Sequence, residues 1–215
     1  MPREVGKDLV TVGVLAVQGS VREHIECLSK MKGVYPLAVK TKEDFLTLDG
    51  LILPGGESTA IGKLIRDFSL SEAIFDFNNR KKPIWGTCAG MILLAKEIAG
   101  EHGFHLGLMD IKVRRNAYGS QLESFSIKLH IPAVSKDLQT LAFIRAPLIE
   151  ETGKQVTVLA KVNDRVVAAR QDNLLVTSFH PELTDELYFY NYFVNMIMNP
   201  PVRNVSNDLT MSCAV

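Results

Sequence analysis

The chain has 215 residues, of which 47% are hydrophobic, so it can bury a substantial core within the length of a single α/β domain. Lys and Arg together number 24, as do Asp and Glu, and no long run of one sign occurs. This balance excludes a net field that favours nucleic acid or an anionic membrane surface. The three cysteines form no C-x-x-C pair, which argues against a disulfide framework and a zinc site. Small neutral or zwitterionic ligands fit this composition best.

We expect no export signal from the residues at the two ends of this sequence. The first eight residues are polar and mixed in charge, and no later apolar run approaches the ~20 residues needed to cross a bilayer. Pro200 and Pro201 end the last helical pattern, and the residues after them are polar and small. We therefore expect a cytoplasmic protein with one domain over residues 1–199 and a flexible tail over residues 200–215.

The first predicted element is a strand over residues 10–17, which are almost all apolar or β-branched. Ser20 and Glu23 then form a capping-box pattern, which predicts a helix over residues 21–31. His24 lies beside the apolar stripe of that helix. Because no second metal-type residue accompanies it at a suitable spacing, we expect a packing role rather than a ligand role. Cys27 is expected in the core.

Two further strands are predicted over residues 35–39 and 51–53, and strands alternating with helices indicate βαβ units and a mostly parallel sheet. The strand over residues 51–53 is followed by Pro54, Gly55, Gly56 and Glu57. Sites in such sheets form at the carboxyl ends of the strands. We interpret this loop as a source of an oxyanion donor that faces Cys88, with Glu57 placed to bind an ammonium group. Ser58 or Thr59 is expected to cap the next helix.

Cys88 lies between a predicted strand at residues 84–85 and a predicted helix over residues 89–98. Buried cysteines usually fill a core, but Gly86 and Gly90 flank this one at equal distance and allow a strained turn that lifts the side chain above the sheet. At a helix N-terminus the thiol pKa is lowered, and the N–H of Ala89 can bind an oxyanion. The pattern therefore favours a nucleophile.

The next segments read as strands over residues 106–113, 122–130 and 142–144, with a loop over residues 114–119. Arg115, next to Asn116, is either solvated or able to hold a carboxylate by a bidentate contact, and Arg145 is a second candidate for that contact. Three closing strands follow over residues 156–160, 166–170 and 174–178, with a hairpin turn at residues 163–164.

His180 and Glu182 come directly after the last strand. If this segment is extended, residues two apart point to the same side, and Pro181 stiffens the chain between them. The spacing suits a general base and the carboxylate that orients it. A last helix, capped by Thr184, is predicted to run to about Met198.

These motifs together resemble the class I (triad) glutamine amidotransferases, and within that class the glutaminase subunits of pyridoxal 5'-phosphate synthases. The cysteine elbow with His-x-Glu specifies the class, and the stretches Gln-Gly-x-x-Arg-Glu-His and Pro-Gly-Gly-Glu-Ser-Thr specify the subfamily. The likeness covers residues 10–198. It implies a three-layer, flavodoxin-like α/β fold with a mostly parallel central sheet and helices on both faces. Tyr118 departs from the phenylalanine that is commoner at its position.

The resemblance also implies a division of roles among the residues. Cys88 would be the nucleophile, His180 the general base and acid, and Glu182 its orienter, with Gly55, Gly56 and Ala89 forming the oxyanion hole. The residues implied to hold L-glutamine are Gly56, Glu57, Ser58, Arg115, Ile144 and Arg145. No cofactor and no metal are implied. The partner would be a barrel-type synthase subunit that accepts ammonia, with no nucleic acid or membrane partner.

Two other interpretations stay open on the residues alone. The chain could serve a different acceptor, such as the imidazole glycerol phosphate synthase of histidine biosynthesis. It could also be a non-catalytic α/β scaffold or a cysteine sensor, although Glu182 beside His180 argues against a sensor, which needs no proton shuttle.

Overall fold

A computed structural model describes residues 9–101, 105–115 and 124–200. Asn116, Tyr118 and the tail beyond residue 200 lie outside the described residues, so the predictions made for them stay predictions. The helices and strands are, in chain order, β1 (Val10–Leu15), α1 (Val21–Ser29), β2 (Val34–Val39), η1 (Glu43–Leu46), β3 (Gly50–Leu53), α2 (Ser58–Asp67), α3 (Leu70–Asn79), β4 (Ile84–Thr87), α4 (Ala89–Leu94), β5 (Ala95–Ile98), β6 (Met109–Arg114), β7 (Ser124–His130), β8 (Leu138–Ile144), β9 (Leu148–Thr152), β10 (Thr157–Val162), β11 (Arg165–Gln171), β12 (Leu174–Thr177), η2 (Pro181–Leu183) and α5 (Tyr188–Met198).

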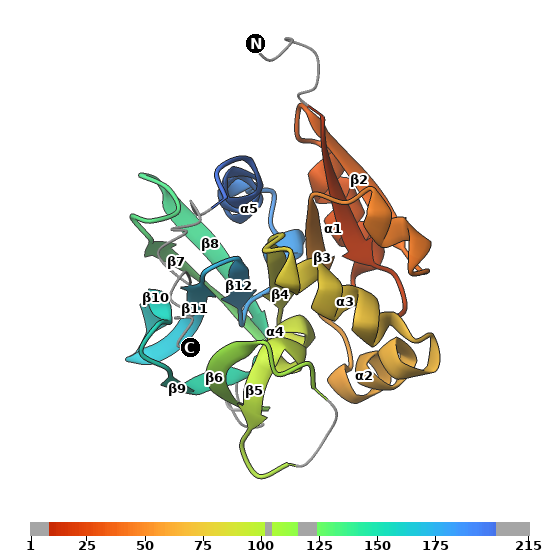
Figure 1. Cartoon of the computed structure of the whole chain (residues 1–215). Helices are drawn as coiled ribbons and strands as arrows, with labels where there is room; N and C mark the ends of the chain where they lie inside the picture. Colours follow the sequence, from red (N-terminus) through yellow and green to blue (C-terminus); the bar gives the residue numbers. More distant parts are fainter. Residues whose placement is uncertain (1–8, 102–104, 116–123, 201–215) are drawn as a thin grey trace, which may run out of the picture.

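The central sheet has a parallel half and a mixed half, in which β5 and β6 pair in parallel and the other pairs are antiparallel. Its strand order is β2-β1-β3-β4-β12-β11-β9-β6-β5, with β10 paired to β11 and a separate β7-β8 hairpin (Figure 1). The five strands from β2 to β12 pair in parallel, whereas β11 pairs antiparallel with β12, β10 and β9. Short turns suffice for antiparallel neighbours, and the predicted turn at Asn163 and Asp164 is confirmed by φ angles of 49° and 61°.

Helices cover both faces of the parallel half, which confirms the three-layer fold. The apolar side chains of α2, α3 and α4 pack with Leu15 and Leu53 on one face. The side chains of α1 and α5 pack with Val14, Ile52 and Trp85 on the other face. Adjacent residues Ile52 and Leu53 thus point to opposite cores, as expected for a strand buried on both sides. Because β3, β4 and β12 pair in parallel, their carboxyl ends lie at the same edge of the sheet.

Three predicted helices have other bounds in the structure. The helix expected over residues 21–31 ends at Ser29. The helix expected over residues 89–98 ends at Leu94, because the chain continues as β5, whose Lys96 and Glu97 are exposed while its ends are buried. An apolar run alone cannot separate a short helix from the strand that follows it. The last helix begins at Tyr188 rather than after Thr184, whose hydroxyl instead donates to the Pro181 carbonyl and closes the turn η2.

The predicted helix caps are also corrected. The Ser20 side chain makes no capping hydrogen bond to α1. At α2 the cap is Glu57, whose carboxylate accepts from the N–H groups of Thr59 and Ala60, so neither Ser58 nor Thr59 serves as the cap. In the part of the chain that the structure describes, no helix is both long and apolar enough to cross a membrane.

Candidate active site

Cys88 occupies the turn between β4 and α4 in a strained conformation. Its φ of 46° and ψ of −101° are rare for a residue with a side chain, and its N–H donates to the Thr177 carbonyl of the neighbouring strand β12 at 2.8 Å. Only 8% of the residue is exposed. The sequence-based prediction of a strained elbow is confirmed.

The flanking glycines have a steric explanation. A Cβ on Gly90 would lie 2.0 Å from the carbonyl oxygen of Leu53, and one on Gly86 would lie 2.5 Å from the carbonyl oxygen of Gly90. Both distances are far inside van der Waals contact. The turn that carries Cys88 can therefore pack onto the end of β3 only if both positions are glycine.

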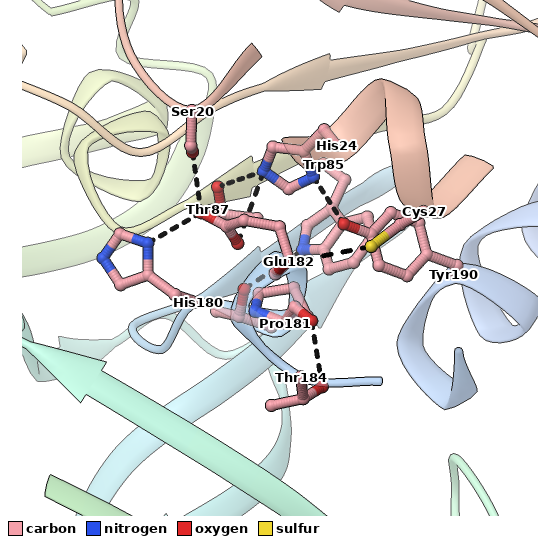
Figure 2. Close-up of polar contacts among 11 residues, drawn as sticks. Ser20, His24, Cys27, Trp85, Thr87, His180, Pro181, Glu182, Thr184 and Tyr190 are labelled. Carbon is pink, nitrogen blue, oxygen red and sulfur yellow. Dashed lines mark hydrogen bonds and ion pairs between the residues drawn. The ribbon is translucent and has the colours of Figure 1, made fainter. Parts of the chain in front are cut away.

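His180 and Glu182 meet as predicted, but through a different local conformation. Their segment forms the 3-10 turn η2 rather than an extended strand, and His180 Nδ1 lies 2.7 Å from Glu182 Oε1 (Figure 2). The backbone N–H of His180 donates to the Ala142 carbonyl at 2.8 Å, which fixes the segment against β8. Ser20 Oγ donates to the same Glu182 oxygen at 2.7 Å.

The charges of this pair are set by their surroundings. Burial acts to lower the pKa of His180, but its hydrogen bond with Cys88 and its interaction with Glu182 raise that pKa to about 10. Burial acts to raise the pKa of Glu182, but His24 and His180 lower that pKa to about 2. Glu182 is therefore ionised at neutral pH and stabilises positive charge on the imidazole, which is the state that follows when a histidine takes a proton from a thiol.

The thiol and the imidazole line one cavity of about 410 Å³ at the carboxyl ends of the parallel strands. The structure brings together nearly all of the predicted site residues, since the lining consists of Gly56, Glu57, Ser58, Cys88, Ala89, Ile92, Arg115, Ile144, Arg145, Pro147 and His180. Glu182 lies behind His180. A Cβ on Gly55 would lie 2.6 Å from His180 Cε1 and 3.5 Å from Cys88 Cβ, so Gly55 borders both groups.

The far end of the cavity contains an ion-pair network. Arg115 Nη2 lies 3.0 Å from Glu57 Oε1, and Arg115 Nη1 lies 2.8 Å from Glu101 Oε2. Burial acts to raise the pKa of Glu57, but hydrogen bonds from Thr59 and Ala60 and the charge of Arg115 lower it. A cation and an anion thus stand side by side, as recognition of a zwitterionic amino acid requires.

Sequence reasoning missed several residues that support the site. Ile92 and Pro147 line the cavity. Gln18 accepts from the N–H of Glu57 at 3.0 Å and so ties the Gly55–Gly56 loop to the end of β1. Its position after a buried parallel strand was the available signal. The contacts of Ser20 and His24 with Glu182 join segments more than 150 residues apart, and no local pattern reveals them.

The fold and the site define a class of protein: an α/β enzyme with a cysteine on a strand-to-helix elbow and a His-Glu pair at the end of a neighbouring strand. Comparison with known proteins narrows this class. Residues 14–199 match the model of the SNO glutamine amidotransferase family, and the chain belongs to that family.

The similarity to individual proteins supports this family assignment. The chain is 62% identical over 185 residues to the pyridoxal 5'-phosphate synthase subunit PdxT of Thermoanaerobacter sp. (strain X514), which covers 86% of this chain and 98% of that protein. It is 52% identical to the PdxT subunit of Ruminiclostridium cellulolyticum, over 86% of this chain and 98% of that one. A crystal structure of a glutamine amidotransferase superposes with a TM-score of 0.81 at 40% identity, over 87% of this chain and 98% of the other.

Proposed function

We propose that the chain is the glutaminase subunit of a pyridoxal 5'-phosphate synthase and hydrolyses L-glutamine to L-glutamate and ammonia. Membership of the glutamine amidotransferase family and 62% identity to a PdxT subunit support this activity. The observation that carries the proposal is the cavity in which Cys88 and His180 face the same space, with His180 held at 2.7 Å by Glu182. A glutaminase of histidine biosynthesis and a cysteine sensor are not favoured by these relatives.

In the proposed chemistry, His180 takes the thiol proton of Cys88, and the sulfur attacks the side-chain amide carbon of glutamine. The tetrahedral oxyanion is bound by the N–H of Ala89, in the first turn of α4, and by the Gly55–Gly56 loop. His180 then gives its proton to the departing nitrogen. Ammonia leaves, and a γ-glutamyl thioester of Cys88 remains. A water that loses its proton to His180 hydrolyses the thioester, which releases glutamate and restores the thiol.

The α-groups of glutamine are assigned to the far end of the cavity. Glu57 would bind the α-ammonium and Arg115 the α-carboxylate, while Ser58, Ile144 and Arg145 line the space between this end and Cys88. The binding roles of these residues are part of the proposal. The separation of recognition from chemistry lets glutamine be held by its constant α-groups while the amide alone reaches the sulfur.

Ammonia released in open water would be protonated and lost, so the activity needs an acceptor. We assign this role to a barrel-type synthase subunit in the cytoplasm. Regulation by that partner would act at the Gly55–Gly56 peptide. Its carbonyl accepts from the N–H of Ser20 at 3.0 Å, and Gly56 has a φ of 158°, so rotation of this peptide would turn an N–H towards or away from the oxyanion.

The proposal is tested by measuring glutamate and ammonia release from glutamine, with and without the synthase subunit. We expect the partner to raise turnover. We expect Cys88→Ala to abolish turnover, while calorimetry still detects binding of glutamine. Turnover that survives in Cys88→Ala would contradict the assignment. Equal rates with and without the partner would contradict the proposed switch. Transfer of ammonia only to a different synthase would contradict the proposed acceptor.

A further inference from the structure

His24 lies deep behind the proposed triad. It stands on α1, has no exposed surface, and approaches Glu182 from the side opposite His180 (Figure 2). Its Nδ1 lies 2.7 Å from the hydroxyl of Tyr190, and its Nε2 lies 3.2 Å from Thr87 Oγ1 and 3.5 Å from Glu182 Oε2. The three partners come from α5, β4 and η2, so the ring joins separate parts of the core at the carboxylate.

The surroundings assign one protonation state to this ring. Burial lowers the pKa of His24 more than the nearby Glu182 raises it, so the ring is neutral and carries one N–H. Burial raises the pKa of Tyr190, whose hydroxyl therefore keeps its proton and can donate to Nδ1. The N–H then lies on Nε2. The opposite tautomer would aim a lone pair at the ionised carboxylate, which is repulsive.

The two oxygens of Glu182 have different environments. Oε1 accepts from Ser20 and His180. Oε2 is fully buried and has no hydrogen-bond partner within the described residues. His24 Nε2, which lies 3.2 Å from Thr87 Oγ1, approaches this oxygen to 3.5 Å. A buried carboxylate oxygen needs a donor, and without one the carboxylate can rotate or attract water.

We propose that His24, in its Nε2–H tautomer, is a positioning residue that holds the Glu182 carboxylate in the rotation in which Oε1 meets His180. This inference rests on the proposed function, because His24 acts only through the triad. It extends the Cys88–His180–Glu182 chain inward to Tyr190. An apolar residue of similar volume would also pack against Trp85, whose ring centroid lies 6.2 Å away, but it would remove the N–H that approaches Oε2.

Two nearly isosteric substitutions separate positioning from packing. In His24→Gln the amide nitrogen reaches the place of Nε2 and can still donate towards Glu182, whereas in His24→Asn the side chain ends near the place of Nδ1. We expect His24→Asn to lower kcat for glutamine on the order of 10- to 100-fold, His24→Gln to lose much less, and KM to change by about 2-fold or less. His130→Gln and His130→Asn, on the exposed end of β7, are the matched controls.

The second readout is the pH dependence of Cys88 alkylation by iodoacetamide, followed on the Cys88 peptide by mass spectrometry. The titratable groups around His24 are Glu182, His180, Tyr190 and Glu23. A misaligned Glu182 stabilises the His180 imidazolium less, so formation of the thiolate should need a higher pH in His24→Asn than in His24→Gln. A purely structural loss would lower the melting temperature without moving this midpoint.

Tyr190→Phe keeps the ring of His24 in place and removes the donor that fixes its tautomer. This variant tests the positioning role if the His24 variants fail to fold. We expect a lower kcat and the same upward shift of the alkylation midpoint. Equal losses in His24→Asn and His24→Gln, or wild-type kcat and midpoint in a folded Tyr190→Phe, would overturn the positioning role. If Cys88→Ala remains active in the same assay, the proposed function fails and this inference fails with it; otherwise the function stands independently.

Discussion

The two ends of the cavity are built in contrasting ways. At the proposed chemical end, the side chains of His180 and Glu182 are 12% and 0% exposed. Their segment follows the parallel strand β12 and is fixed to β8 by the N–H of His180. At the proposed recognition end, the side chains of Arg115 and Glu57 are 26% and 54% exposed, and Arg115 follows β6 in the mixed half of the sheet. The chemical end is held by buried hydrogen bonds, while the recognition end is held by ion pairs that face solvent.

Because the two ends differ in this way, we expect kcat and KM to respond to different substitutions. Buried groups that are rigidly placed act on the transition state, where a small misplacement is costly. Exposed ion pairs contribute little to stability and can exchange partners, so a substrate can replace them. We therefore expect the chemical end to control kcat and the recognition end to control KM.

The largest effect is expected for Glu182→Gln. The amide can still contact His180 but cannot stabilise the imidazolium, so kcat should fall about 100-fold or more with KM nearly unchanged. Steady-state glutaminase kinetics of the complex measure this. Glu186→Gln is the matched control, because Glu186 accepts from the N–H of Thr140 and does not line the cavity. A rise in KM without loss of kcat would contradict the expectation that the chemical end controls kcat.

The next effect concerns Arg115. Loss of a charge-assisted contact with the substrate carboxylate should raise KM about 10- to 100-fold in Arg115→Gln, with a much smaller change in kcat. Arg114→Gln offers the control, since Arg114 is paired with Glu150 and does not line the cavity. If Arg115→Gln instead loses kcat and keeps its KM, Arg115 belongs to the chemical end.

The buried pair should also leave a signature in stability against pH. The raised pKa of His180, about 10 against 6.5, gives stability that is full below pH 6.5 and lost as pH rises through 10. The lowered pKa of Glu182 gives stability that is present above pH 4.5 and lost as pH falls towards 2. Thermal melts should therefore show the largest deficit of Glu182→Gln, roughly 2–8 °C, near pH 6 and a smaller one near pH 10. A deficit that grows towards pH 10 would contradict this coupling.

The smallest effect is expected for Glu101→Gln. Glu101 forms an ion pair of 2.8 Å with Arg115. In the proposed binding mode it would compete with the substrate carboxylate for this side chain. Removing this exposed competitor should lower KM for glutamine by about 1.5- to 5-fold and leave kcat unchanged. Calorimetric titration with glutamine provides an independent measure. An increase in KM would show that Glu101 supports Arg115 rather than competing for it.

The same contrast explains how much of the fold could be predicted. The buried parallel strands β1, β3, β4 and β12 were found because their residues are apolar on both faces. The strand β5 was missed because Ala95 continues the apolar run of α4. The start of α5 was missed because Thr184 resembles a cap but bonds within η2. Tertiary pairing decides such boundaries, and local patterns do not contain it.

The site could be predicted where a motif places its residues locally. The spacing of the Gly-x-Cys-x-Gly elbow indicated its geometry. The spacing of His-x-Glu indicated that the two side chains meet, but they meet through the turn η2 and not through an extended segment. For Arg115 the residues alone left a solvated role open, and only the fold shows it beside Glu57. His24 and Ser20 were interpreted as packing and capping residues, yet both reach Glu182 from the first helix turn of the chain. Such contacts depend on the whole fold.

The proposed thioester provides the most direct test of the central claim. The complex is mixed with glutamine, quenched in acid within the first turnover, and digested for mass spectrometry. We predict a γ-glutamyl group on the peptide that contains Cys88, which is lost in Cys88→Ala and decays as glutamate is released. Glutamate formation without this adduct, or an adduct on Cys27 instead, would contradict the account.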